Sequence, residues 1–210
     1  MPPFTVLHVC MGNICRSPMA ERLLSLAVRE RLARRSAGTA IDAGAADHLV
    51  HSHSAGTGAW HAGEEMNPPA ARQVRSRGGD ADEFGARKLR SEHIDAADLV
   101  LTATADQQEY VVALRPDAAG RTFVLGEFGR LLAGLDISTL PPVTDTPDPD
   151  TLYARGVALV AAVEKARRGS SSPLPTDDLD DPWGRGDQCF SRVADEIEEA
   201  VRPLAAVLLP

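Results

Sequence analysis

The sequence lacks several features that would assign it to other classes of protein. No apolar run approaches the roughly 20 residues that a membrane-spanning helix needs, and the N-terminal residues MPPFTVLHVC lack the basic segment and cleavage site of a secretory signal. Three cysteines, Cys10, Cys15 and Cys189, are too few for a disulfide scaffold. A formal net charge of −8 argues against broad electrostatic binding of nucleic acid. We therefore expect a cytoplasmic protein that binds neither membranes nor nucleic acid.

What the sequence contains is typical of one soluble globular domain. The chain has 210 residues, of which 43% are hydrophobic and 25% charged, a balance that argues against disordered and collagen-like proteins. We expect a single domain over residues 1–210, with loop insertions near residues 38–47, 136–150 and 169–180. The last two insertions are rich in Pro, Asp and Ser, which is typical of exposed loops.

Strand and helix patterns alternate along the chain. Residues 4–9 form a short apolar run with β-branched side chains, which predicts a buried strand. Ser17 and Pro18 then supply an N-cap hydroxyl and a proline suited to the first helical turn, and the helix should reach about Arg35. Similar patterns predict strands at 48–52, 99–102 and 122–125 and helices at 69–76, 105–114, 151–168 and 187–208. This alternation predicts an α/β fold, a small doubly wound, mainly four-stranded parallel sheet with helices on both faces.

The segment between the first strand and the first helix has the composition of a phosphate cradle. Five residues separate Cys10 from Arg16, and the backbone N–H groups of such a loop can surround a tetrahedral dianion at a helix N-terminus. Arg16 would add a bidentate contact, and Gly12 and Asn13 tolerate the positive φ angles of a tight turn. The same donors would favour the thiolate form of Cys10, a nucleophile to which Ser17 could donate a hydrogen bond. A small buried cysteine at a strand end is the alternative, but the coincidence of these residues favours the cradle.

A longer stretch around this loop resembles a known family. Residues 9–21 (VCMGNICRSPMAE) look like the signature of the bacterial low-molecular-weight protein tyrosine phosphatases, which also carry their loop at the start of the chain. The resemblance continues through 54–63 (SAGTGAWHAG), 97–101 (ADLVL) and 181–184 (DPWG). It implies a flavodoxin-like fold and hydrolysis of phosphotyrosine in a protein substrate through a cysteinyl-phosphate intermediate. It also implies that the enzyme needs no cofactor and no metal.

The resemblance assigns roles within the loop. Cys10 would attack phosphorus, and Arg16 and the loop N–H groups would stabilise the equatorial oxygens of phosphate or another oxyanion. The phosphate-binding residues would be Met11, Gly12, Asn13, Ile14, Cys15 and Ser17. Cys15 would form a disulfide with Cys10 on oxidation and so protect it from irreversible damage; the alternative is a small residue that packs beneath the loop.

Cleavage also needs a proton for the leaving oxygen, which a carboxylic acid on a loop can supply. The residues alone do not distinguish among the aspartates at 177, 178, 180 and 181, and a solvated acidic loop is the alternative for each. The family pattern has the acid directly before proline and so selects Asp181. By resemblance, Trp60 and Trp183 would form aromatic walls that favour phosphotyrosine, although a tryptophan such as Trp60 in a Gly-rich loop is also typical of a partly buried anchor.

Two other functions fit parts of the sequence. An arsenate reductase of the same fold would need a resolving cysteine pair near the middle of the chain, but no cysteine occurs between Cys15 and Cys189. A non-catalytic phosphotyrosine-binding regulator is the third hypothesis, and the retention of nucleophile, arginine, serine and acid together argues against it. His8, His51 and His53 are discounted as a metal cluster because no carboxylate or cysteine lies at ligand spacing beside them.

Overall fold

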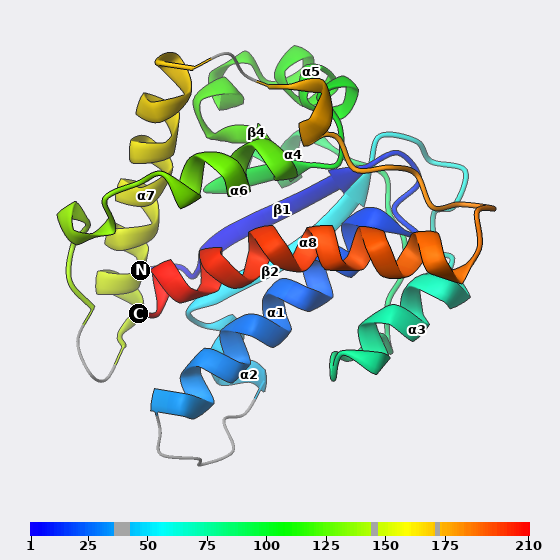
Figure 1. Ribbon diagram of the computed structural model, residues 1–210, viewed down its shortest axis with the longest axis horizontal. Coiled ribbons are helices and arrows are strands. Elements are labelled where there is room, and N and C mark those ends of the chain that lie inside the picture. The colour runs from blue at the N-terminus through cyan, green and yellow to red at the C-terminus, as the bar shows by residue number, and fades with distance from the viewer. Residues whose placement is uncertain (36–42, 144–146, 171–172) are drawn as a thin grey trace.

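A four-stranded parallel sheet lies at the centre of the structure, a computed structural model that describes residues 1–35, 43–143, 147–170 and 173–210 (Figure 1). Its strands, in the spatial order β2-β1-β3-β4, are β1 (Phe4–Cys10), β2 (Val50–Gly56), β3 (Leu99–Thr102) and β4 (Thr122–Val124). β1 is central and pairs with β2 along its whole length, from Phe4 opposite Val50 to Cys10 opposite Gly56. The prediction of a doubly wound parallel sheet is confirmed.

Helices cover both faces of this sheet because β1 buries alternate side chains on opposite sides. Phe4 and Val6 join a large core with residues of six described helices, α1 (Arg16–Arg35), α2 (Ala43–Asp47), α3 (Pro68–Ser76), α6 (Leu125–Ala133), α7 (Pro149–Arg168) and α8 (Asp187–Leu208). Leu7 and Val9 join a smaller core with residues of α4 (Ser91–Asp95) and α5 (Ala105–Leu114). Figure 1 shows α8 running in front of the sheet beside α1, with the two chain ends close together.

The second strand differs from its predicted position. The pattern predicted residues 48–52, whereas β2 spans Val50–Gly56. Ser54, Ala55 and Gly56 have little intrinsic preference for strands, but pairing with β1 extends the ladder through them. β2 is an edge strand, and its exposed His51 is followed by these small buried residues beside the end of β1.

The predicted loop at 136–150 is partly structured, which corrects the sequence-based expectation. A single 3₁₀ turn occupies Ile137–Thr139, and α7 begins at Pro149 rather than at residue 151. The carboxylate of Asp148 accepts hydrogen bonds from the N–H groups of Asp150 and Thr151, so an aspartate assigned to an exposed loop is a helix N-cap. In the region near 38–47 that we expected to be an insertion, residues 43–47 form α2 (Ala43–Asp47) and residues 38–42 lie outside the described residues.

The sequence patterns also missed α6, which follows β4 directly. Its segment LGEFGRLLA contains two glycines, which lower helix propensity, and Leu125 had been assigned to the strand. Gly126 is needed for packing: a Cβ there would lie 2.5 Å from the carbonyl oxygen of Asp177. Two further 3₁₀ turns cover Pro116–Arg121 and Pro175–Asp177. Within the described ranges, every helix is too short or too polar to cross a membrane.

Candidate active site

The loop between β1 and α1 is held from outside by the segment that follows β2. Three carbonyl groups of the loop accept hydrogen bonds of 2.8–2.9 Å from that segment: Cys10 from Thr57, Met11 from Gly58, and Ile14 from Asn67. In a trans peptide, the N–H of the next residue points opposite to the carbonyl. The N–H groups of Met11, Gly12 and Cys15 therefore turn into the loop, where they form a concave set of donors.

The end of β2 allows this close approach because it carries glycine. A Cβ on Gly56 would lie 2.7 Å from the carbonyl oxygen of Met11 and 3.0 Å from the backbone nitrogen of Asn13. Real side chains do not tolerate the first of these distances. The absence of a side chain at Gly56 therefore lets the end of β2 pack directly against the backbone of the loop between β1 and α1.

Asn13 connects the loop to its surroundings. It is buried, has a φ of 55°, and its side-chain nitrogen donates to the hydroxyls of Ser17 (2.9 Å) and Ser54 (2.8 Å). Its side-chain oxygen accepts from the N–H of Arg87 at 2.9 Å. Because Ser17 accepts from Asn13, the hydroxyl proton of Ser17 is free to donate to Cys10, whose sulfur lies 3.0 Å away.

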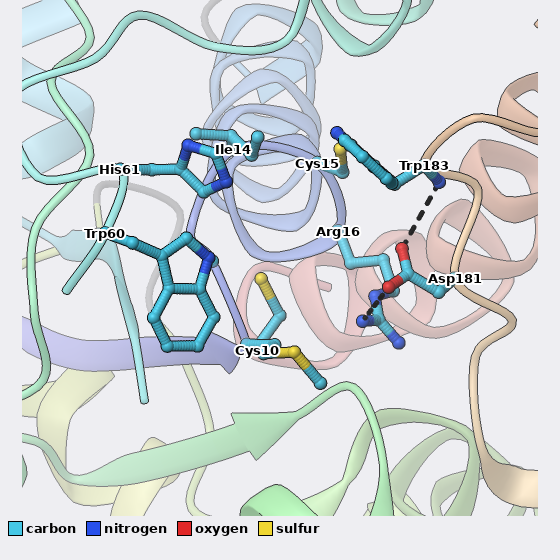
Figure 2. A pocket seen from close by; sticks show the side chains of 10 residues that line it. Cys10, Ile14, Cys15, Arg16, Trp60, His61, Asp181 and Trp183 are labelled. Atoms are coloured by element: carbon cyan, nitrogen blue, oxygen red, sulfur yellow. Dashed lines mark hydrogen bonds and ion pairs between the residues drawn. The ribbon is translucent and has the colours of Figure 1, made fainter. Parts of the chain in front are cut away.

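Arg16 connects the phosphate loop to the segment that carries the candidate acid. Its side chain is only 5% exposed. Nη1 donates to the carbonyl oxygen of Leu179 at 3.1 Å, and Nη2 lies 3.1 Å from Oδ2 of Asp181. The other carboxylate oxygen of Asp181 accepts from the N–H of Trp183 at 3.3 Å (Figure 2). Cys10, Arg16 and the candidate acid Asp181 thus lie around one opening.

The four aspartates that the sequence did not distinguish have different partners. Those partners are Arg130 for Asp177, the N–H of Ala105 for Asp178, Arg185 and Arg192 for Asp180, and Arg16 for Asp181. Asp177 is buried and accepts two hydrogen bonds from Arg130, at 3.1 and 2.7 Å. Asp181 alone among the four lines the pocket that contains Cys10.

This pocket has a volume of about 320 Å³ and lies at the carboxyl end of β1. Its lining residues are Cys10, Met11, Gly12, Ile14, Cys15, Arg16, Trp60, His61, Asp181 and Trp183. Figure 2 shows Trp60 and His61 on one side of the opening and Trp183 with Asp181 on the other. Trp60 is 64% exposed and Trp183 63%, so Trp60 is a wall of the opening and not a buried anchor. Asn13 and Ser17 are not among the lining residues; they are buried and hydrogen-bonded to each other.

His61 is a pocket residue to which the sequence analysis gave no role. Its Nδ1 lies 2.8 Å from Oε2 of Glu64, and its Cδ2 lies 3.0 Å from where a Cβ of Gly12 would be. The only sequence signal was its place beside Trp60 in the stretch that resembles the family. A single histidine in a sequence does not reveal which distant segment its ring contacts in the folded protein.

Cys15, His8 and His53 have pKa values shifted from their usual range, with clear causes. Burial raises the pKa of the Cys15 thiol to about 12, together with the nearby Cys10 and Asp181, so Cys15 is a neutral thiol at physiological pH. Burial lowers the pKa of His8 and of His53 to about 3. His51 and His53 stack at 5.2 Å, and the described residues contain no group of three or more His, Cys, Asp or Glu arranged to hold a metal ion.

Comparison with known proteins identifies the family. Residues 5–139 match the model for the low molecular weight phosphotyrosine protein phosphatases, and the chain belongs to this family of hydrolases. It is 30% identical over 183 residues to the low molecular weight protein-tyrosine-phosphatase of Streptomyces coelicolor, which covers 80% of this chain and 99% of that protein. The family resemblance inferred from the sequence is therefore confirmed.

Solved structures support the fold. The tyrosine phosphatase Wzb from Escherichia coli K30, in complex with sulphate, matches with a TM-score of 0.60 and 21% identity, over 97% of this chain and 96% of that chain. The YwlE arginine phosphatase from Geobacillus stearothermophilus matches with a TM-score of 0.57 and 24% identity, over 97% and 92% of the two chains. At these identities the likeness concerns the arrangement of sheet and helices.

Proposed function

We propose that this protein hydrolyses phosphotyrosine in protein substrates in two steps, through a phosphate ester on the sulfur of Cys10. The observation that carries the proposal is the convergence of Cys10, Arg16 and Asp181 on one pocket. Family membership supports phosphatase chemistry. Neither arsenate reduction nor non-catalytic binding is favoured by any feature of the pocket.

The phosphate group would bind in the loop. The inward N–H groups of Met11, Gly12 and Cys15 supply donors, and the N-terminus of α1 adds partial positive charge. Gly12, Asn13 and Ile14 shape the turn, and Arg16 holds two equatorial oxygens. These donors are fixed before the substrate arrives, so they stabilise the charge of the transition state without reorganisation.

In the first step, the Cys10 thiolate attacks phosphorus in line with the leaving phenolic oxygen. The S–P bond forms while the P–O bond breaks, and Asp181 gives its proton to the departing oxygen. In the second step, the Asp181 carboxylate takes a proton from water and the resulting nucleophile attacks phosphorus. The S–P bond breaks, inorganic phosphate leaves, and the hydrogen bond from Ser17 stabilises the returning thiolate.

The walls of the pocket favour an aromatic phosphoester. Trp60 and Trp183 border the opening on opposite sides, and a phenyl ring can stack against either indole (Figure 2). Cys10 is buried at the base of the loop, which a shorter phosphoserine side chain would not reach. The substrate is therefore a phosphotyrosine-containing protein.

Site-directed variants test this mechanism with an aryl phosphate. Cys10→Ser should abolish hydrolysis, and Asp181→Ala should lower kcat by a factor of about 10²–10⁴, the usual contribution of a general acid. Asp180→Ala is the matched control, because it removes a neighbouring carboxylate that pairs with Arg192 instead of Arg16; its rate should stay close to that of the wild type. Full activity in Cys10→Ser would end the proposal, and thioredoxin-coupled reduction of arsenate would support the reductase instead.

A further inference from the structure

The indole of Trp60 lies directly against a glycine of its own segment. A Cβ added to Gly58 would lie 2.1 Å from both Cη2 and Cζ3 of Trp60 and 2.6 Å from Cζ2. These three atoms belong to the six-membered ring, so the ring occupies the space in which any other residue would carry its Cβ. Carbon atoms in ordinary contact are about 3.5–4.0 Å apart. The position of the Trp60 ring is therefore compatible only with glycine at position 58.

The backbone at Gly58 does not itself require glycine. Its φ angle is not positive, in contrast with that of Gly63 in the same segment, which is 87°. Its N–H donates to the carbonyl oxygen of Met11 at 2.9 Å, and alanine would keep this hydrogen bond. What the missing side chain provides at position 58 is room for the indole.

The rest of the indole is open to solvent. Trp60 is 64% exposed and lines the pocket that contains Cys10. Its ring centroid lies 6.5 Å from that of His61, which stands on the same side of the opening (Figure 2). A methyl group at position 58 would have to move the exposed ring by roughly 1.5 Å to reach an ordinary contact distance. Because the ring is not part of the core, this displacement would leave the fold intact.

We propose that Gly58 is a specificity-determining residue that acts through Trp60. The absence of a side chain at Gly58 sets the position of the indole at the opening, and this position determines how well the ring stacks against the phenyl group of the substrate. Stacking is sensitive to such a change, because aromatic pairs prefer particular offsets and separations. The inference rests on the proposed function, in which Trp60 is a wall for an aromatic phosphoester.

Two phosphonates test the proposal without turnover, because their C–P bond is not hydrolysed. Phenylphosphonate carries an aromatic ring, whereas methylphosphonate offers a similar oxyanion without one. Gly58→Ala should raise the dissociation constant of phenylphosphonate by about fivefold, the worth of one aromatic contact, and leave that of methylphosphonate unchanged. Gly85→Ala is the matched control, because a Cβ on this exposed glycine would have no atom within 4 Å; both dissociation constants should equal those of the wild type.

Two results of this binding experiment would overturn the proposal. An equal increase in both dissociation constants in Gly58→Ala would show that the substitution disturbs the phosphate loop and not the aromatic wall. No increase for phenylphosphonate would show that the position of the indole does not affect recognition of the ring.

A double variant tests whether Gly58 acts through the indole. Once the indole has been removed, a residue that acts only through it has no further effect on affinity. Phenylphosphonate should therefore bind equally well to Trp60→Ala and to the variant that combines Trp60→Ala with Gly58→Ala. A further loss of affinity in the double variant would show that Gly58 acts on the loop through its contact with Met11, and would overturn the proposal.

Tryptophan fluorescence reports the displacement of the ring itself. The chain contains two tryptophans, so all tryptophan emission of Trp183→Phe comes from Trp60. In this background, Gly58→Ala should change the emission intensity and lower the anisotropy, whereas Gly85→Ala should change neither. Unchanged emission in Gly58→Ala would show that the ring has not moved and would overturn the proposal. A failure of the proposed function is seen separately, as full activity in Cys10→Ser, because neither binding nor fluorescence requires turnover.

Discussion

Replacement of Asn13 by alanine is the most direct test of how the phosphate loop keeps its shape. The substitution removes three hydrogen bonds, two buried ones to Ser17 and Ser54 and a partly buried one from the N–H of Arg87, with lengths of 2.8–2.9 Å. At a net value of about 1 kcal/mol each, their loss costs about 3 kcal/mol. Alanine must also adopt a φ of 55°, which adds about 1 kcal/mol. We therefore expect Asn13→Ala to lower the free energy of unfolding by about 4 kcal/mol, the sum of these two terms.

Urea unfolding followed by circular dichroism measures this change, and Asn13→Gly is the matched control. Glycine adopts the positive φ without strain, so it should recover about 1 kcal/mol of the loss. Both variants should also lower kcat/KM, because Ser17 is no longer held with its proton toward Cys10. If Asn13→Ala unfolds with nearly the wild-type free energy, the three hydrogen bonds do not hold the loop and the reasoning fails.

Three further predictions concern the acid segment, Cys15 and the aromatic walls. Burial alone would raise the pKa of Asp177, but the hydrogen bonds and charge of Arg130 and its neighbours lower it. The Asp177 carboxylate therefore stabilises the fold at pH values above its unfolded-state pKa of about 4, and this stabilisation is lost as the pH falls through its lower folded-state pKa. In acid titrations of the free energy of unfolding, Asp177→Asn should therefore lose less stability than the wild type. If Cys15 protects Cys10, thiol treatment after peroxide should restore more activity in the wild type than in Cys15→Ser, and equal recovery would refute the idea. Trp60→Ala and Trp183→Ala should each raise KM for an aryl phosphate more than for a small alkyl phosphate, and an equal effect on both substrates would exclude stacking.

Secondary structure was predictable where the local pattern and the packing agree. The predicted helices at 105–114 and 187–208 coincide with α5 and α8, and in α8 the buried residues, among them Phe190, Val193 and Ile197, recur at helical spacing. β2 and α6 were predicted less well. Strand pairing with β1 extends β2 through residues that do not favour strands, and α6 tolerates glycine because Gly126 must pack against the Asp177 backbone. In both cases a tertiary contact overrides the local preference.

The residues of the candidate site also differ in how far the sequence alone could identify them. Cys10 and Arg16 were identifiable because the loop that contains them is continuous in sequence. Asp181 could be selected only through the family resemblance, since four aspartates lie together and their partners, from Arg16 to Arg192, come from different parts of the chain. His61 was missed because its contact with Gly12 joins two separate loops.

The sequence by itself determined the strand, the phosphate loop and the first helix, because the geometry of these adjacent elements depends mainly on local backbone preferences and helix capping. Only the tertiary structure decided which aspartate faces Arg16 and which aromatic residues border the opening. Those outcomes depend on hydrogen bonds and packing between segments far apart in the chain. Such contacts exist only once the sheet and helices have assembled, so no local pattern encodes them.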